Sequence, residues 1–194
     1  AGWPIWAIIL ASVVALGIIG ERLWSLRASE VAPASLLDEV AREWKQGGVN
    51  EAMLNRLSLH SPLGRVFAAG LKNADRSREV MKEAIEEAGR GTTGELERFL
   101  TTLGTIASVS PLLGLFGTVI GMVEIFGALK PSGGSPAELA HGISVALYNT
   151  AMGLIVAIPS MIFYRHFRAK VDALVLEMEL QAIKLVELVH GERK

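Results

Sequence analysis

Three stretches of the chain carry no charged side chain: residues 1–20, 99–123 and 142–164. A helix rises about 1.5 Å per residue and the hydrocarbon core of a bilayer is about 30 Å thick, so roughly 20 apolar residues cross it. Each stretch is therefore predicted to form a transmembrane helix. The first stretch also has the length of a signal peptide, but it lacks the charged start and the small-residue cleavage site of such a peptide.

The segment between the first two apolar stretches has the pattern of a solvated helical region. Residues 21–98 hold 12 basic and 13 acidic side chains. Residues that favour helix starts and ends divide it into four predicted helices. The fourth is expected to continue into the second transmembrane helix, although glycines 89, 91 and 94 interrupt its pattern. The predicted boundaries are Pro33 and Ser35 to Gly47-Gly48, a start at Asn50-Glu51, Ser61-Pro62 to near Asn73, and a start at Ser77.

After the third apolar stretch, apolar residues recur at alternating spacings of three and four, as in a coiled-coil seam. This pattern predicts that the third transmembrane helix continues into the tail and packs against other helices. Those helices belong either to this chain or to another subunit, and the pattern fits both. The seam positions are Tyr164, Phe167, Val171, Leu174, Met178, Gln181, Leu185 and Leu188, of which Gln181 is the polar exception.

Basic residues near the ends of membrane spans favour the cytoplasmic side. Seven of them flank the spans on one side: Arg22, Arg27, Arg90, Arg98, Arg165, Arg168 and Lys170. The opposite side offers only Lys130, so the N-terminus is predicted to lie in the periplasm and the C-terminus in the cytoplasm of a bacterial inner membrane.

The predicted fold class is therefore an all-α membrane protein with three transmembrane helices, two of them extended into the cytoplasm, and a small helical cytoplasmic region. Its predicted parts are transmembrane helix 1 (1–20), a cytoplasmic helical region (21–98), transmembrane helix 2 (99–129), a periplasmic loop (130–141), transmembrane helix 3 (142–164) and a cytoplasmic helical tail (165–194). The sequence starts without Met, and we expect that its true N-terminus lies further upstream.

The composition excludes several classes of function. The formal net charge of −1 says little about partners, and no nucleic-acid partner is expected. The chain has no cysteine and so no disulfide. The four histidines are scattered without metal-ligand spacing, and no Ser/His/Asp set converges, so neither an enzyme, a metal site nor a cofactor is expected. Gly89 and Gly94 have the spacing of a phosphate-binding loop, but Glu95 follows where that loop needs a lysine. The histidines are His60, His141, His166 and His190.

The second and third spans contain polar and helix-weakening residues that an isolated anchor would avoid. Polar groups in hydrocarbon usually face protein or water. Prolines free a backbone carbonyl about one turn earlier, and glycines allow helices to approach closely. This composition predicts a packed bundle. The helix-shaping and packing residues are Pro111, Gly114, Gly117, Gly121 and Pro159, and the polar residues are Ser108, Ser110, Thr118, Glu124, Ser144, Asn149, Thr150 and Ser160.

The second and third spans run antiparallel if they form a symmetric hairpin. Residues whose numbers add to about 268 then share a depth in the bilayer. Thr118 lies level with Thr150, and Glu124 lies level with Ser144. Two threonines at one depth predict a polar ring if several copies surround a pore. The alternative is that each hydroxyl bonds its own helix at i−4.

Glu124 is the only formal charge inside the three spans. At about 100° per residue it lies on the face of Gly117 and Gly121, about 120° away from Thr118. We therefore expect Glu124 to face a neighbouring helix near the outer end of the second span. Glu124, Ser144 and Asn149 are therefore a possible polar site within the membrane. Such a site could be part of a proton path or form an interhelical hydrogen bond, and the sequence favours neither.

Two long motifs of the chain resemble those of the ExbB/TolQ proton-channel family, relatives of the flagellar stator protein MotA, and the chain is most like ExbB. The motifs are SPLLGLFGTVIGM in the second span and ALxxTAxGLxVAIP in the third. With the three-span layout, the resemblance covers essentially the whole chain. MotA-like chains have four spans and a larger cytoplasmic domain, which disfavours a stator.

The resemblance implies a pentameric homo-oligomer around two helices of a single-span ExbD/TolR-like partner that carries a titrating aspartate. Thr118 and Thr150 are then lumen-lining residues of the proton pathway. Proton flow would drive work on a TonB-like or TolA-like transducer, in the TonB or the Tol-Pal system. A non-conducting membrane scaffold is the alternative from a different class. The family's GIxEAL motif has a glutamate where this chain has Val145, so no acid is carried over to that position.

Overall fold

The computed structural model describes residues 2–129, 131 and 133–192. Lys130, on which the predicted orientation partly rests, lies outside the described residues, as do parts of the predicted loop and tail. The described residues form eight helices. They are α1 (Gly2–Ser25), α2 (Ala28–Val31), α3 (Leu36–Gly47), α4 (Glu51–His60), α5 (Pro62–Leu71), α6 (Arg78–Leu96), α7 (Leu100–Gly127) and α8 (Pro136–Val189).

The chain divides into two compact units. The membrane unit comprises residues 1–22 and 99–166, and the charged unit comprises residues 23–98 and 167–194. The long helix α8 contributes its first part to the membrane unit and its last part to the charged unit. Among the described residues, three helical stretches are long and apolar enough to cross a membrane, and they overlap the three predicted transmembrane segments.

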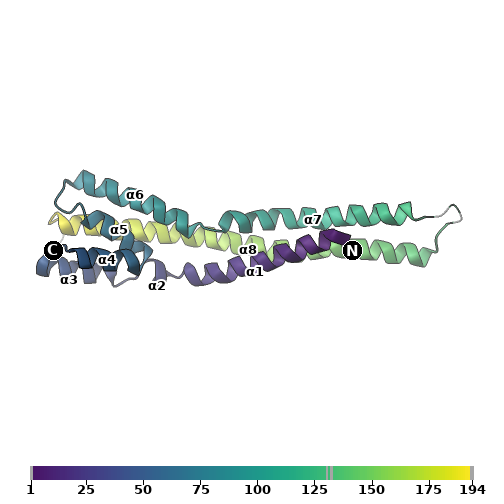
Figure 1. Cartoon of the computed structure of the whole chain (residues 1–194), viewed down its shortest axis with the longest axis horizontal. Coiled ribbons are helices and arrows are strands. Elements are labelled where there is room, and N and C mark those ends of the chain that lie inside the picture. Colours follow the sequence, from purple (N-terminus) through teal and green to yellow (C-terminus); the bar gives the residue numbers. More distant parts are fainter. Residues whose placement is uncertain (1, 130, 132, 193–194) are drawn as a thin grey trace. The chain divides into compact units, whose positions relative to one another are not determined.

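In the membrane unit, α7 and the first part of α8 run antiparallel beside each other, with α1 alongside (Figure 1). The Trp3 ring of α1 meets the Phe116 ring of α7 edge to face, with centroids 5.6 Å apart. Within the apolar windows of the three spanning helices, 22–33% of the positions are buried inside the chain. The remaining apolar surface is left for lipid or for other membrane helices.

In the charged unit, α4, α5 and α6 begin where capping side chains satisfy free backbone N–H groups. The Asn50 side chain accepts from the Met53 amide at 2.8 Å, and Ser61 Oγ accepts from the Gly64 amide at 3.0 Å. Ser77 does the same for α6. The predicted starts of these helices are confirmed, as is the end of α3, where Gly48 takes a φ of 70°.

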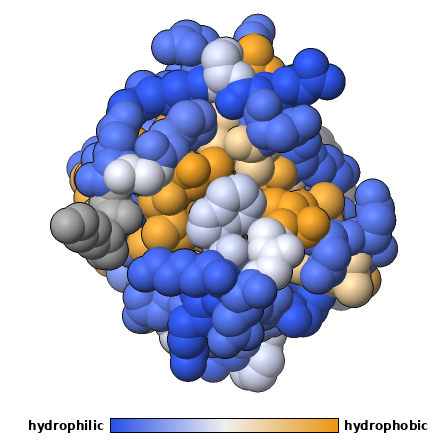
Figure 2. Space-filling view, turned by 90° about the vertical axis from the view of Figure 1, so that its left-hand side faces the viewer, coloured by the Kyte–Doolittle hydropathy of each residue, from blue (hydrophilic) through white to orange (hydrophobic). Residues whose placement is uncertain are grey.

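The end of α8 forms part of the core of the charged unit. Phe167, Val171, Leu174, Met178 and Leu185 are all buried, which confirms that the predicted seam packs on this chain's own helices. Gln181, the polar exception, donates to Glu177 on its own helix. Seen from the end where α3 to α6 lie, hydrophilic side chains surround an apolar centre (Figure 2).

Two boundaries differ from the prediction. Helix α6 does not run into α7, because residues 97–99 form a turn and Phe99 takes a left-handed φ of 66°. The glycines 89, 91 and 94 lie inside α6 and do not break it. Helix α8 begins at Pro136, inside the predicted loop, because Ser135 Oγ accepts from the Glu138 amide at 3.2 Å and proline suits the first turn.

Candidate functional site: a threonine pair in the membrane hairpin

Thr118 of α7 and Thr150 of α8 are in direct contact. Their Oγ1 atoms lie 2.5 Å apart. Thr118 Oγ1 also lies 3.0 Å from the Ala146 carbonyl oxygen of α8, and Thr150 Oγ1 lies 3.3 Å from the Gly114 carbonyl oxygen of α7. Each hydroxyl therefore reaches the carbonyl that stands four residues before the opposite threonine. The equal depth predicted for the two threonines is confirmed.

The predicted alternative, a local bond, is present as well. Thr118 Oγ1 lies 3.2 Å from the Gly114 carbonyl oxygen of its own helix. The two interpretations are therefore not exclusive, because one hydroxyl has both local and interhelical acceptors within reach. Both threonines are half-buried in the chain, so part of each side chain remains open to a neighbouring molecule.

Glycines make this close approach of the helices possible. A Cβ atom on Gly114 would lie 2.7 Å from the Asn149 carbonyl oxygen, and one on Gly153 would lie 2.5 Å from the Ser110 carbonyl oxygen. Both distances are shorter than van der Waals contact with backbone atoms that cannot rotate away. Any side chain at Gly114 or Gly153 would therefore push the helices apart and lengthen the contact between the threonines.

The two threonine hydroxyl groups can share their hydrogen bonds in two arrangements. Each hydroxyl donates one hydrogen bond and accepts up to two. If Thr118 donates to Thr150, then Thr150 donates to the Gly114 carbonyl; if Thr150 donates, then Thr118 has the Ala146 or the Gly114 carbonyl as its acceptor. In both arrangements the first donor keeps a free oxygen lone pair. The pair can thus accept a proton-bearing group, such as a neutral carboxylic acid, without breaking its own bonds.

The other predicted polar residues of the spans have separate places. Ser108 and Ser160 donate to carbonyls of their own helices, at 3.0 and 2.7 Å. Ser110 and Asn149 are 0% and 1% exposed between the helices. Pro111 and Pro159 lie inside α7 and α8, which continue through them.

The structure places two of the three residues of the possible polar site together. Glu124 and Asn149 line one cavity beside Gly117 and Gly121, which agrees with the face predicted for Glu124. Ser144 is exposed and is not among the described lining residues. Within the described part of the chain, the Glu124 carboxylate forms no ion pair.

Sequence analysis missed the partners on α8. Ala146 and Gly153 face the predicted glycines Gly121 and Gly114 of α7, and Gly142 faces the Ile125 side chain. The signal was present in the sequence, because these three residues and Asn149 follow one another at spacings of four, three and four along one helix face.

Residues 58–180 match the model of the MotA/TolQ/ExbB proton channel family. The chain belongs to this family. Its membership identifies the protein as a multi-pass membrane protein of the proton-channel type, not an enzyme. The matched region includes all of α7 and the site residues of α8.

Several curated relatives in the MotA/TolQ/ExbB family carry ExbB or TolQ names. An ExbB homolog from Methanothermobacter thermautotrophicus is 34% identical over 174 residues, which cover 87% of this chain and 62% of that protein. The Tol-Pal system protein TolQ of Haemophilus influenzae is 35% identical over 150 residues, which cover 69% of this chain and 65% of that protein. Biopolymer transport protein exbB1 of Vibrio cholerae is 48% identical over 66 residues, which cover 33% of this chain and 28% of that protein. The chain thus spans less than two thirds of the length of these relatives.

Proposed function

We propose that this chain is the ring-forming subunit of an inner-membrane, proton-driven motor. Several copies, five in the expected ring, surround helices of a single-span ExbD-like partner that carries an intramembrane carboxyl group. Proton flow through the ring drives mechanical work on a TonB-like transducer for active transport across the outer membrane. The N-terminus lies in the periplasm and the C-terminus in the cytoplasm, as the basic residues favour.

The threonine pair carries this proposal. It is a pair of hydroxyl groups inside two apolar candidate spans, half-buried and with an oxygen lone pair to spare. A neutral carboxylic acid of the partner can donate to that oxygen, and a carboxylate can be bound when one hydroxyl turns from its carbonyl acceptor. Thr118 and Thr150 therefore line the lumen and stabilise both charge states of a moving carboxyl group.

The surface of the membrane unit supports assembly. Large apolar side chains remain exposed on α1, α7 and the first part of α8, among them Leu112, Val119 and Ile155. Such a surface suits both lipid and neighbouring membrane helices. Small residues already join α7 to α8 within one subunit, so the exposed branched residues supply the outer contacts of the ring.

A TolQ-like role in the Tol-Pal system is the second candidate, favoured by the TolQ relatives at 35% and 31% identity. The two roles differ in the transducer, which is TonB-like in one and TolA-like in the other. Co-purification of the complex with each transducer separates them. Capture of the TonB-like protein alone supports the ExbB-like role, and capture of the TolA-like protein alone contradicts it.

Proton flux tests the proposal against a non-conducting scaffold. The chain is reconstituted in lipid vesicles with and without its single-span partner, and an internal pH dye follows acidification under an imposed potential. We expect flux above the rate of empty vesicles when the partner is present. Flux equal to that of empty vesicles, from a complex that is intact by size-exclusion chromatography, would show a scaffold instead.

A further inference from the structure

A cavity of about 340 Å³ lies next to the threonine pair in the membrane unit. Helices α7 and α8 form most of its wall, and Gly2 of α1 contributes to it. Its volume is large enough for several water molecules, since one water needs roughly 10–15 Å³ measured in this way. Small and apolar residues form much of the lining, which includes Gly117, Ile120, Gly121, Ile125, Ala128, Gly142, Val145 and Ala146.

The cavity contains two polar side chains among the described residues, Glu124 and Asn149. Glu124 is exposed and lies near the end of α7, whereas Asn149 is 1% exposed and lies deep between the helices. No other titratable side chain lines the described part of the cavity. The cavity therefore offers a carboxylate at one end and a buried carboxamide at the other.

The deep end of the cavity adjoins the threonine pair. Gly117 and Asn149 line the cavity, and each directly precedes one of the two threonines. Ala146 also lines the cavity, and its carbonyl is an acceptor for the Thr118 hydroxyl. The cavity thus adjoins residues that hold the pair in place, and the threonines themselves are not among its described lining residues.

Val145 lies in the wall of the same cavity. It occupies the position at which the GIxEAL motif of the family has a glutamate. A carboxylate at 145 and the carboxylate of Glu124 would therefore enter one common space from opposite helices. This chain has valine at position 145, and Glu124 is the acid that lines the described part of the cavity.

We propose that Glu124 is the proton-accepting carboxylate of a hydrated entry chamber that supplies the threonine pair. This inference rests on the proposed proton-channel function. A hydronium ion in the cavity transfers its proton to a Glu124 oxygen, where an O–H bond forms and water is released. The O–H bond then breaks as the proton passes through water to the carboxylate of the single-span partner, and the Glu124 carboxylate is regenerated.

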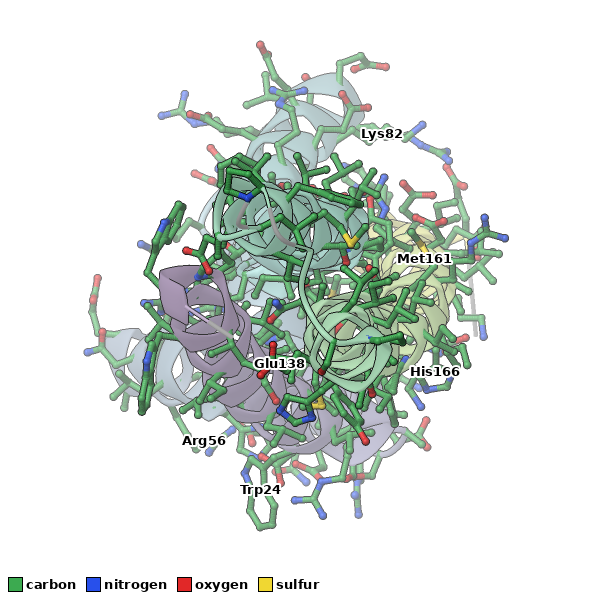
Figure 3. The ribbon with its side chains drawn as sticks, turned by 90° about the vertical axis from the view of Figure 1, so that its right-hand side faces the viewer. Trp24, Arg56, Lys82, Glu138, Met161 and His166 are labelled. Carbon is green, nitrogen blue, oxygen red and sulfur yellow. The ribbon has the colours of Figure 1, made fainter. Side chains whose placement is uncertain are left out.

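Proton flux of the reconstituted complex with its partner tests the role of the acid. Glu124→Gln keeps the size of the side chain and removes the charge, and we expect flux to fall at least about tenfold. Glu124→Asp keeps an acid and is expected to retain at least half of the flux. The matched control is Glu138→Gln, because Glu138 is an exposed acid in the first turn of α8 (Figure 3) and is not among the described residues that line this cavity. Its flux is expected to equal that of the native complex.

Moving the acid across the cavity is the sharper test. In the Glu124→Gln background, adding Val145→Glu is expected to raise the flux at least about threefold above that of Glu124→Gln alone. Native flux in Glu124→Gln would overturn the inference, and so would equal losses in Glu124→Gln and Glu124→Asp without recovery by Val145→Glu. Thr118→Val serves as the reference variant. If Thr118→Val lowers the flux while Glu124→Gln keeps native flux, the role of Glu124 is refuted and the proposed proton-channel function is retained.

Discussion

The threonine pair joins two helices at a point where neither backbone could otherwise form a hydrogen bond to the other. An interhelical hydrogen bond of this kind in a membrane contributes roughly 0.6 to 2 kcal/mol. That energy is small, so the short distance between the hydroxyls depends on the backbone approach at Gly114 and Gly153. Glycine packing positions the pair, and the pair is proposed to bind the carboxyl group of the partner.

Gly153→Ala tests this dependence. The new methyl group would lie 2.5 Å from the Ser110 carbonyl oxygen, so α8 must move away from α7. We expect the midpoint of thermal unfolding in detergent to fall, with a loss of about 1–3 kcal/mol of stability. Tryptophan fluorescence of the full chain measures this midpoint.

The control for this substitution is Gly17→Ala in α1, where a Cβ atom meets nothing within 4 Å. Its unfolding midpoint should stay at or slightly above the native value, because alanine favours helix over glycine by about 1 kcal/mol. If Gly153→Ala and Gly17→Ala have the same unfolding midpoint, the close approach of α7 and α8 does not limit the stability of the hairpin.

Helices of the charged unit could be predicted from local signals. Asn50, Ser61 and Ser77 satisfy backbone amides at helix starts, and this chemistry depends on neighbours within three residues. The break between α6 and α7 could not be predicted in this way. It centres on Phe99, a residue type that rarely takes a left-handed conformation.

A tertiary contact accompanies that break. The Arg22 guanidinium lies 5.8 Å from the centre of the Phe99 ring, over 70 positions away along the chain. The interaction is invisible to a pattern search over a short window. The early start of α8 is different, because the sequence Ser135-Pro136-Ala137-Glu138 is a capping signal that was present and overlooked.

The buried seam of α8 predicts different losses of stability for two leucines of this helix. Leu185 is 0% exposed, whereas Leu180 on the same helix is 46% exposed. Leu185→Ala should therefore lower the free energy of unfolding by about 2–5 kcal/mol, through lost burial and the cavity left behind. Leu180→Ala should change it by less than about 0.5 kcal/mol.

Denaturant titration of the full chain in detergent, followed by far-UV circular dichroism, compares the two leucine variants. Equal losses in both would contradict the packing of the seam on this chain's own helices. A smaller oligomer in Leu180→Ala alone, seen by size-exclusion chromatography, would assign the exposed side of α8 to a contact with another copy.

At the scale of the whole molecule, segregation of charge was enough to predict three membrane-spanning helices and an all-helical fold. The site was predictable in part. The antiparallel hairpin placed Thr118 level with Thr150 by numbering alone, since both helices rise equally per residue. The crossed carbonyl bonds and the cavity were not predictable, because they depend on how far the helix backbones approach.

The threonine pair and the cavity with Glu124 are proposed to take different positions relative to the pore. The threonine pair is proposed to face the carboxyl group of the partner, and the cavity with Glu124 is proposed to supply protons from the other side of the same hairpin. Both depend on the same glycine contacts between α7 and α8. In the proposed ring, the hairpin is thus the functional unit that each copy would contribute.

Proton flux through the reconstituted complex with Thr118→Val tests the central claim most directly. Valine matches the shape of threonine and removes the hydroxyl, so flux should fall at least about tenfold, a change of about 1.4 kcal/mol or more in the barrier. Thr118→Ser keeps the hydroxyl and should retain most of the flux. Thr105→Val is the matched control, because the Thr105 hydroxyl bonds only the Thr101 carbonyl of its own helix among the described residues. Native flux in an assembled Thr118→Val complex would contradict a role for the threonine pair in proton transfer.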